Sequence, residues 1–187
     1  MDVTEATFEQ DVIERSRVTP VVVDFWAAWC GPCRALTPVL EQEVERRNGE
    51  VVLAKVDVDA SPGLSATYRV QGIPAVKGFR DGRVVAEFVG ARAPAAVASF
   101  VDELLAPPRV SALVEDLRAS GELPAVRAAL EGGNPELALD LVLAEIPNSS
   151  PERRERLRDI AVSVFHDLGH EDPVTVAYRR RLATALY

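Results

Sequence analysis

Both cysteines and both tryptophans of the 187-residue chain lie in one stretch, Asp24-Phe25-Trp26-Ala27-Ala28-Trp29-Cys30-Gly31-Pro32-Cys33. The β-branched run Val21–Val23 leads into this stretch and predicts a buried strand. Behind the stretch, apolar residues recur at helical spacing, at Leu36, Val39, Leu40 and Val44. Cys30 is therefore expected at the point where a strand turns into a helix.

The expected position of Cys30 at a helix start has a chemical consequence. Free N–H groups at the start of a helix stabilise a thiolate, and the thiolate is the form that attacks disulfides. Cys33 follows after two intervening residues, so the pair can close a small ring and the second cysteine can expel the first from a mixed disulfide. Gly31 and Pro32 are expected to make the intervening turn tight.

Two other interpretations of the cysteine pair are less favoured. A zinc site needs a second pair of ligands, but the chain has no further cysteine, and its two histidines, His166 and His170, lie far downstream. A structural disulfide that closes so short a loop would contribute little chain entropy. Redox chemistry remains, and it is typical of a Cys-x-x-Cys motif beside alternating strands and helices.

Composition narrows the remaining functions. The formal net charge of −8 argues against nucleic-acid binding, which needs a basic face. No apolar run approaches the ~20 residues that span a bilayer, so no membrane partner is expected. Met1–Glu5 is acidic and polar, which is not typical of a secretory signal. Because both cysteines belong to one redox motif, we expect a cytoplasmic protein, with no metal and no cofactor.

The first half of the chain alternates helix and strand patterns. Beyond the cysteine stretch, a helix is expected over Thr4–Ser16, a strand over Val51–Asp59 and a short helix over Ala60–Tyr68. Asp81-Gly82 signals a hairpin turn, and Pro94 opens a helix with one apolar face. This order predicts a mixed sheet with helices on both faces.

The segment Val23–Cys33 resembles the active-site segment of thioredoxins. The order of the expected elements also matches the α/β thioredoxin fold over residues 1–106. The resemblance implies a protein-disulfide reductase in which Cys30 is the attacking cysteine and Cys33 the resolving one. It also implies that thioredoxin reductase is the electron donor.

The resemblance assigns roles to three residues outside the cysteine pair. Asp24 resembles the buried acid that assists proton transfer from the resolving thiol, Lys55 resembles its lysine partner, and Pro74 resembles the cis-proline that faces the disulfide. Asp24 also lies in an otherwise apolar stretch, so burial is expected. A buried carboxyl is reluctant to ionise and can hold a proton near neutral pH.

A substrate-contact surface follows from the same resemblance. Its residues are Trp29, Gly31, Pro32, Ile73, Pro74 and Gly90. Lys77 and Gly78 depart from the family pattern, because thioredoxins usually carry apolar residues in the strand after the cis-proline. This departure predicts weaker packing at the centre of the domain.

After Pro108 the chain predicts helices joined by short loops, which form a second, all-α domain over residues 109–187. Apolar stripes recur at helical spacing in several segments. Asn134 can cap a helix that has Pro135 at its first position. Leu137–Ala144 is apolar nearly all round, which is typical of a helix between neighbours. A last helix is expected from Asp172.

The segment Gly133–Leu139 resembles the turn between the two helices of a tetratricopeptide repeat, with at most two degenerate units in the tail. Generic amphipathic helices would give a similar pattern. His166 and His170 are four residues apart, but Gly169 is expected to end their helix and no third ligand joins them. A metal site is therefore not expected there.

A thioredoxin domain followed by such a tail resembles the bacterial chaperedoxins of the YbbN/CnoX type. The tail segment Ala177–Leu182 and the ending Leu186-Tyr187 carry this part of the resemblance. It implies client proteins held through mixed disulfides and delivered to the chaperonin. The implied partner-binding residues are Tyr178, Arg179, Arg180, Arg181, Leu182 and Leu186.

Plainer interpretations of the tail stay open. Arg179–Arg181 is also typical of a solvated helix end, and the last helix can simply cap the helical stack. Three functions therefore compete. The chain is a dithiol reductase whose tail selects partners, a client-holding chaperone in which the dithiol is auxiliary, or a scaffold with little turnover.

Overall fold

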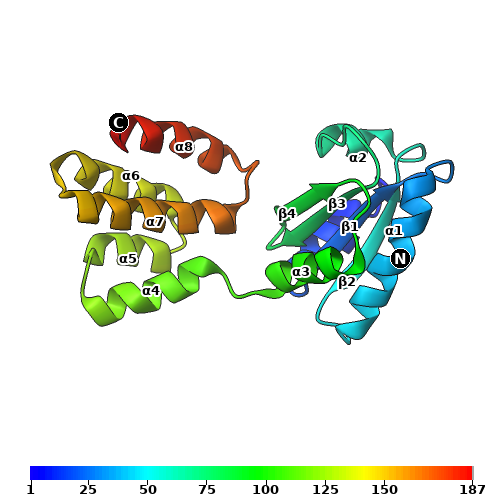
Figure 1. The fold of residues 1–187 in the computed structure, drawn as a ribbon, viewed down its shortest axis with the longest axis horizontal. Coiled ribbons are helices and arrows are strands. Elements are labelled where there is room, and N and C mark those ends of the chain that lie inside the picture. Colours follow the sequence, from blue (N-terminus) through cyan, green and yellow to red (C-terminus); the bar gives the residue numbers. More distant parts are fainter. Residues whose placement is uncertain (187) are drawn as a thin grey trace. The chain divides into compact units, whose positions relative to one another are not determined.

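The computed structural model describes residues 1–186. The chain forms two compact units, residues 1–106 and residues 107 onward. Figure 1 shows a sheet flanked by helices in the first unit and helices alone in the second.

A four-stranded mixed sheet forms the centre of the first unit. Its strands are β1 (Val21–Trp26), β2 (Val52–Asp57), β3 (Ala75–Arg80) and β4 (Arg83–Val89). The strand order is β2-β1-β3-β4, with β1 parallel to β2 and β3 antiparallel to both β1 and β4. The helices are α1 (Gly31–Arg46), α2 (Pro62–Thr67) and α3 (Pro94–Leu105). This architecture confirms the predicted thioredoxin fold.

Alternation along β1 separates two apolar clusters. Val21, Val23 and Phe25 face the cluster that includes the N-terminal helical segment, whereas Val22 faces the cluster built by α1 and α3. Since side chains alternate along a strand, Asp24 lies on the same face as Val22. The acid is thereby directed toward the helix that carries the cysteines.

Two expected elements differ in detail. The segment expected as one helix over Thr4–Ser16 forms a π-helix over Glu9–Glu14 and a 3₁₀ turn over Arg15–Arg17. The strand expected to reach Asp59 ends at Asp57, because the carboxylate of Asp57 accepts a hydrogen bond from the N–H of Asp59 at 2.9 Å and turns the chain. The predicted hairpin is confirmed, with Asp81 at φ 54° and Gly82 at φ 78°.

The expectation of weaker central packing is wrong at Gly78. A β-carbon on Gly78 would lie 3.0 Å from Leu104 Cδ1 and 3.2 Å from Phe100 Cζ. The missing side chain therefore lets α3 pack directly on β3. Lys77 is also buried, and its ammonium group pairs with the carboxylate of Glu87 on the neighbouring edge strand. A charged residue is accommodated there because its partner lies beside it.

In the part of the second unit that the structure describes, residues 107–186, five helices surround one apolar core. They are α4 (Arg109–Ser120), α5 (Pro124–Glu131), α6 (Pro135–Glu145), α7 (Pro151–Leu168) and α8 (Pro173–Leu186), with a 3₁₀ turn over Ile146–Asn148. Asn134 caps α6 as predicted, since its Oδ1 accepts from the N–H of Leu137 at 3.0 Å. Helix α6 packs against α5, α7 and α8, which confirms its predicted place between neighbours.

A side chain of α7 caps the first turn of α4. The carboxylate of Asp167, near the end of α7, accepts hydrogen bonds from the backbone N–H groups of Arg109 at 3.0 Å and Val110 at 2.7 Å. Both groups belong to the first turn of α4, where N–H groups have no partner within their own helix. The sequence pattern did not indicate this cap, because its two sides are far apart along the chain.

Candidate active site

The two cysteines form a disulfide at the N-terminus of α1. Cys30 is the N-cap residue of this helix, and its Sγ accepts a hydrogen bond from the backbone N–H of Cys33 at 3.2 Å. The residue is 4% exposed, whereas Cys33 is fully buried. After reduction, a thiolate at Cys30 would meet the positive end of the helix and a preplaced donor.

Asp24 lies fully buried beneath α1. Its Oδ2 accepts a hydrogen bond from Thr37 Oγ1 at 2.8 Å, and its Oδ1 has no hydrogen-bond partner within residues 1–186. Burial raises the pKa of Asp24 to about 6, while the Thr37 hydrogen bond and the positive charge of Lys55 offset only part of that rise. The carboxyl can therefore gain or lose a proton close to neutral pH.

Lys55 neighbours Asp24 in the sheet but does not bond to it. The two residues are register partners on the parallel strands β2 and β1. The ammonium group of Lys55 instead pairs with Glu41 Oε1 at 3.0 Å and lies 3.9 Å from Asp2 Oδ1. The hydrogen bond to Glu41 raises the pKa of Lys55. Lys55 thus acts on Asp24 through space and not through a hydrogen bond.

A backbone hydrogen bond joins the predicted cis-proline, Pro74, to Gly90 of the predicted substrate-contact surface. The Ile73–Pro74 peptide bond is cis, and the carbonyl of Pro74 accepts a hydrogen bond from the N–H of Gly90 at 2.8 Å. Gly90 has φ +87°, a conformation that favours glycine. Gly31 differs from it, because no atom lies within 4 Å of the place a β-carbon would take. Its missing side chain leaves backbone open beside the disulfide.

Trp29 is the most exposed apolar side chain next to the cysteines, with 68% of its surface accessible. Its indole Nε1 donates a hydrogen bond to Asp59 Oδ2 at 2.7 Å, which fixes the ring despite its exposure. The loops that carry Trp29 and Asp59 follow the parallel strands β1 and β2, so they emerge at the same edge of the sheet.

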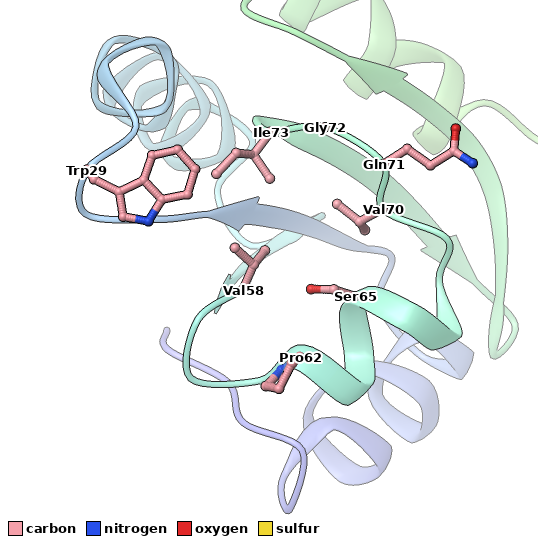
Figure 2. A pocket seen from close by; sticks show the side chains of 8 residues that line it. All are labelled: Trp29, Val58, Pro62, Ser65, Val70, Gln71, Gly72 and Ile73. Carbon is pink, nitrogen blue, oxygen red and sulfur yellow. The ribbon is translucent and has the colours of Figure 1, made fainter.

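A pocket of about 490 Å³ opens beside Trp29. Figure 2 shows Trp29, Val58 and Ile73 gathered around it, with the side chain of Gln71 pointing away. The lining residues are Trp29, Val58, Pro62, Ser65, Val70, Gln71, Gly72 and Ile73.

Only Trp29 and Ile73 of this lining were among the predicted contact residues. The others come from α2 and the loops on either side of it. The parallel pairing of β1 and β2 was the one signal that could have indicated Val58, because this residue directly follows β2.

The predicted tail residues divide into two groups. Tyr178 and Leu182 are buried in the core of the second unit, so neither side chain is available to a partner, contrary to expectation. Arg179, Arg180 and Arg181 are exposed.

Two of these arginines also make contacts within the unit. Arg181 pairs with Asp140 at 2.8 Å and lies 4.4 Å from the centre of the Tyr178 ring, and Arg179 Nη2 lies 2.8 Å from His170 Nδ1. Leu186 packs partly against the core, and Tyr187 lies outside the described residues.

The histidines do not share a helix. His166 lies inside α7, which ends at Leu168, and His170 follows Gly169. Within residues 1–186 no group of three or more His, Cys, Asp or Glu side chains is placed to hold a metal ion. None of the helices described is both long and apolar enough to cross a membrane.

A mixed sheet whose first strand leads into a Cys-Gly-Pro-Cys disulfide at a helix start defines a dithiol–disulfide oxidoreductase. Comparison with known families agrees. The thioredoxin family profile matches residues 1–103, and a tetratricopeptide repeat profile matches residues 110–187.

Known thioredoxins resemble about half of the chain. Thioredoxin C-2 of Corynebacterium nephridii is 42% identical over 103 residues, which cover 55% of this chain and 94% of that protein. The thioredoxin of Pseudomonas aeruginosa is 40% identical over 102 residues, 54% of this chain and 93% of that protein. The bifunctional thioredoxin reductase/thioredoxin of Mycobacterium leprae is 40% identical over 97 residues, 52% of this chain and 21% of that protein. The chain belongs to the thioredoxin family and carries a tetratricopeptide-like repeat domain after its thioredoxin domain.

Proposed function

We propose that the chain reduces disulfides of client proteins through Cys30 and Cys33, with the helical unit binding clients or partners. The observation that carries the proposal is the hydrogen bond from the N–H of Cys33 to Cys30 Sγ at the start of α1. That donor, together with the helix dipole, stabilises a thiolate on Cys30 and makes it the attacking residue.

The reaction has two exchange steps. The Cys30 thiolate attacks one sulfur of the client disulfide, so a Cys30–client bond forms and the other client sulfur leaves as a thiolate. The Cys33 thiol then loses its proton and attacks Cys30 Sγ. The Cys30–client bond breaks, the client sulfur leaves as a second thiolate, and the Cys30–Cys33 disulfide forms. The client is reduced and the dithiol is oxidised.

Asp24 is the proposed acceptor of the Cys33 proton. The acid lies beneath the helix that carries Cys33, and burial raises its pKa to about 6. A carboxyl with this pKa is ionised near pH 7 and still holds a proton readily. Lys55 and Glu41 form an ion pair next to the acid. The charge of Lys55 lowers the pKa of Asp24, and the charge of Glu41 raises it.

The surface beside Trp29 is the proposed client-contact surface. It combines the predicted residues Gly31, Pro32, Pro74 and Gly90 with the pocket that contains Trp29 and Ile73. An apolar pocket next to an exposed tryptophan suits an extended client segment that places its disulfide over Cys30. The proposed electron donor is thioredoxin reductase, an activity that is fused to thioredoxin in the Mycobacterium leprae relative.

Catalysed reduction of insulin tests this function. With thioredoxin reductase and NADPH, the full chain should reduce insulin, and both Cys30→Ser and Cys33→Ser should abolish turnover. Retained turnover in either variant would exclude the dithiol cycle.

Both cysteines belong to the redox pair, which suits a protein of a reducing compartment, and we propose the cytoplasm as its location.

A client-holding function of the chaperedoxin type is the second candidate. The match of residues 110–187 to a tetratricopeptide repeat profile favours it, because such repeats commonly offer surfaces to other proteins. In this version the helical unit holds an unfolding client and passes it to the chaperonin, and the dithiol protects client cysteines.

The proposed chaperonin contact is confined to the exposed face of α8, where Arg180 is the clearest candidate. Deleting the end of the chain would remove Tyr178 and Leu182 from the core, so a charge reversal is the cleaner test. Arg180→Glu should weaken chaperonin binding while the helical content stays unchanged. Arg83→Glu, on the edge strand of the other unit, is the control. Equal binding by both variants would exclude this contact.

A further inference from the structure

The hydroxyl group of Thr37 lies between the buried carboxyl of Asp24 and the backbone of Cys33. Its Oγ1 is 2.8 Å from Asp24 Oδ2 and 3.0 Å from the carbonyl oxygen of Cys33. Thr37 is one helical turn beyond Cys33 in α1, so its side chain reaches back to the turn that carries the resolving cysteine. The sequence pattern around the cysteines did not single out this residue.

The number of protons limits what Thr37 can do. A threonine hydroxyl donates one hydrogen bond and accepts two. When Asp24 is ionised, both neighbours of the hydroxyl are acceptors, and its single proton satisfies one of them. When Asp24 is protonated, its O–H donates to Thr37 Oγ1, and Thr37 donates to the Cys33 carbonyl. Both short contacts are therefore complete hydrogen bonds only when Asp24 holds a proton.

We propose that Thr37 is a positioning residue for the resolving step. Its hydroxyl holds the carboxyl of Asp24 against the turn of Cys33 and reverses its hydrogen bond when the carboxyl gains a proton. This inference rests on the proposed function, in which the proton of the Cys33 thiol passes to Asp24 as Cys33 attacks the Cys30–client disulfide. The structure contains the product of that step, the Cys30–Cys33 disulfide.

The other groups near Asp24 are either paired with each other or apolar. The charged residues that act on Asp24 are Lys55 from β2 and Glu41 from α1, and they bond to each other. Strand β3 places Val76 opposite Asp24. The apolar cluster on this face of the sheet, which contains Val22, receives only apolar side chains from α3. These are Val97, Phe100, Val101 and Leu104. Thr37 is thus the one hydrogen-bond partner that the described residues provide for Asp24.

The test measures how the resolving step depends on pH. The reduced full chain is mixed with 5,5′-dithiobis(2-nitrobenzoic acid), and the second release of thionitrobenzoate, whose rate does not depend on reagent concentration, is followed from pH 4.5 to 8.5. Thr37→Val removes the hydroxyl and keeps the shape, whereas Thr37→Ser keeps the hydroxyl. Thr184→Val is the matched control, because Thr184 Oγ1 also donates to a carbonyl one turn back, that of Arg180, at 3.2 Å.

The wild-type rate should rise with an inflection near the Asp24 pKa of about 6. The Thr37 hydrogen bond to the ionised carboxylate lowers the pKa of Asp24, because a charge-assisted bond outweighs the additional neutral bond of the protonated state. Without it, the Thr37→Val inflection should move alkaline by about one pH unit, which is ~10-fold in rate on the acidic side. Thr37→Ser and Thr184→Val should keep the wild-type inflection. A carboxyl-carbon titration of Asp24 by NMR in the oxidised chain should move in the same direction and needs no turnover.

Two results would overturn the role of Thr37 alone. One is a Thr37→Val inflection equal to that of wild type, and the other is an equal alkaline shift in Thr37→Val and Thr37→Ser. In both cases Asp24→Asn must abolish the inflection. If Asp24→Asn keeps the inflection, Asp24 does not receive the proton, and the proposed role of Asp24 fails together with that of Thr37.

Discussion

At the residue scale, the chemistry depends on three neighbouring groups with different surroundings. Cys30 caps helix α1 and is 4% exposed, Cys33 lies buried in the first turn of that helix, and Asp24 lies buried on β1. Each environment favours a different charge state. The helix start favours a thiolate on Cys30, and burial favours a protonated Asp24.

The first prediction concerns the two thiols. In the reduced protein near pH 7, iodoacetamide should label Cys30 before Cys33, because Cys30 is slightly exposed, Cys33 is fully buried, and the sulfur of Cys30 receives a hydrogen bond. Peptide mass spectrometry after a short pulse measures the ratio, and labelling in denaturant gives the reference for equal access. Faster labelling of Cys33 would reverse the two roles.

The second prediction concerns stability and pH. The pKa of Asp24 is about 6 in the folded protein and 3.8 as its ordinary value. The folded state therefore binds more protons between these values, so this group's contribution to stability is complete below pH 4 and is lost as pH rises through 6. The loss corresponds to ~3 kcal/mol, since one pKa unit is about 1.36 kcal/mol.

Asp24→Asn should thus stabilise the oxidised protein at pH 7–8 by up to ~3 kcal/mol, with the gain disappearing near pH 4. Urea unfolding of both proteins at several pH values measures the difference and cancels all other titrating groups. A difference that stays constant with pH would mean that Asp24 titrates like an exposed acid.

Sequence patterns predicted these residues unevenly. The burial of Asp24 followed from its apolar neighbours, and the helix start at Cys30 followed from the stripe behind it. Thr37 could not be predicted, because its role depends on a distance between a strand and a helix. The pairing of Lys55 with Glu41 could not be predicted for a related reason. Packing decides whether the ammonium group of Lys55 turns toward Asp24 or toward Glu41.

At the element scale, the close approach of α3 to β3 is set by one missing side chain. Gly78→Ala should destabilise the first unit by ~1–3 kcal/mol, because its β-carbon would meet Leu104 and Phe100 at 3.0–3.2 Å. Gly31→Ala is the matched control and should leave stability nearly unchanged, as nothing lies within 4 Å of its β-carbon position. Urea unfolding compares the two. A stabilised Gly78→Ala protein would show that α3 moves away at little cost.

The cap at α4 gives a prediction for the second unit. Asp167→Ala should destabilise this unit by ~1–2 kcal/mol, because the N–H groups of Arg109 and Val110 lose their acceptor. Asp159→Ala, at an exposed position of the same helix, should stay within ~0.5 kcal/mol of wild type. Circular dichroism during urea unfolding measures both changes. Equal effects of the two substitutions would mean that water satisfies the first turn of α4.

Element boundaries were predictable where local signals define them. Proline at the first turn of α3 and Asn134 before α6 both mark their helices. The end of β2 at Asp57 was not predictable from hydrophobic alternation, since the alternating pattern runs on to Asp59. The side chain of Asp57 turns the chain there, and alternation contains no information about such a bond.

At the scale of the whole molecule, one chain joins a redox domain to a repeat domain. The disulfide, the buried acid and the pocket are all built from residues 1–106. The order of strands and helices made the first fold predictable. The tail was predictable as helices, but which of its side chains face the core was not, as Tyr178 and Leu182 demonstrate.

The division between units predicts separable activities. In the variant with Cys30 and Cys33 both replaced by serine, insulin reduction should be lost, whereas suppression of thermal aggregation of a cysteine-free client should be kept if the helical unit holds clients. Light scattering follows the second activity, with serum albumin as the control for nonspecific protection. Loss of both activities together would tie client holding to the dithiol and remove the chaperone candidate as an independent function.

The central claim is that Cys30 attacks client disulfides and Cys33 resolves the product. Incubation of the reduced Cys33→Ser protein with insulin, followed by non-reducing electrophoresis, tests this claim most directly, with Cys30→Ser as the matched control. The account predicts a mixed disulfide that accumulates through Cys30 in the first variant, disappears with dithiothreitol, and is absent from the second. Accumulation in Cys30→Ser at an equal or higher level would contradict it.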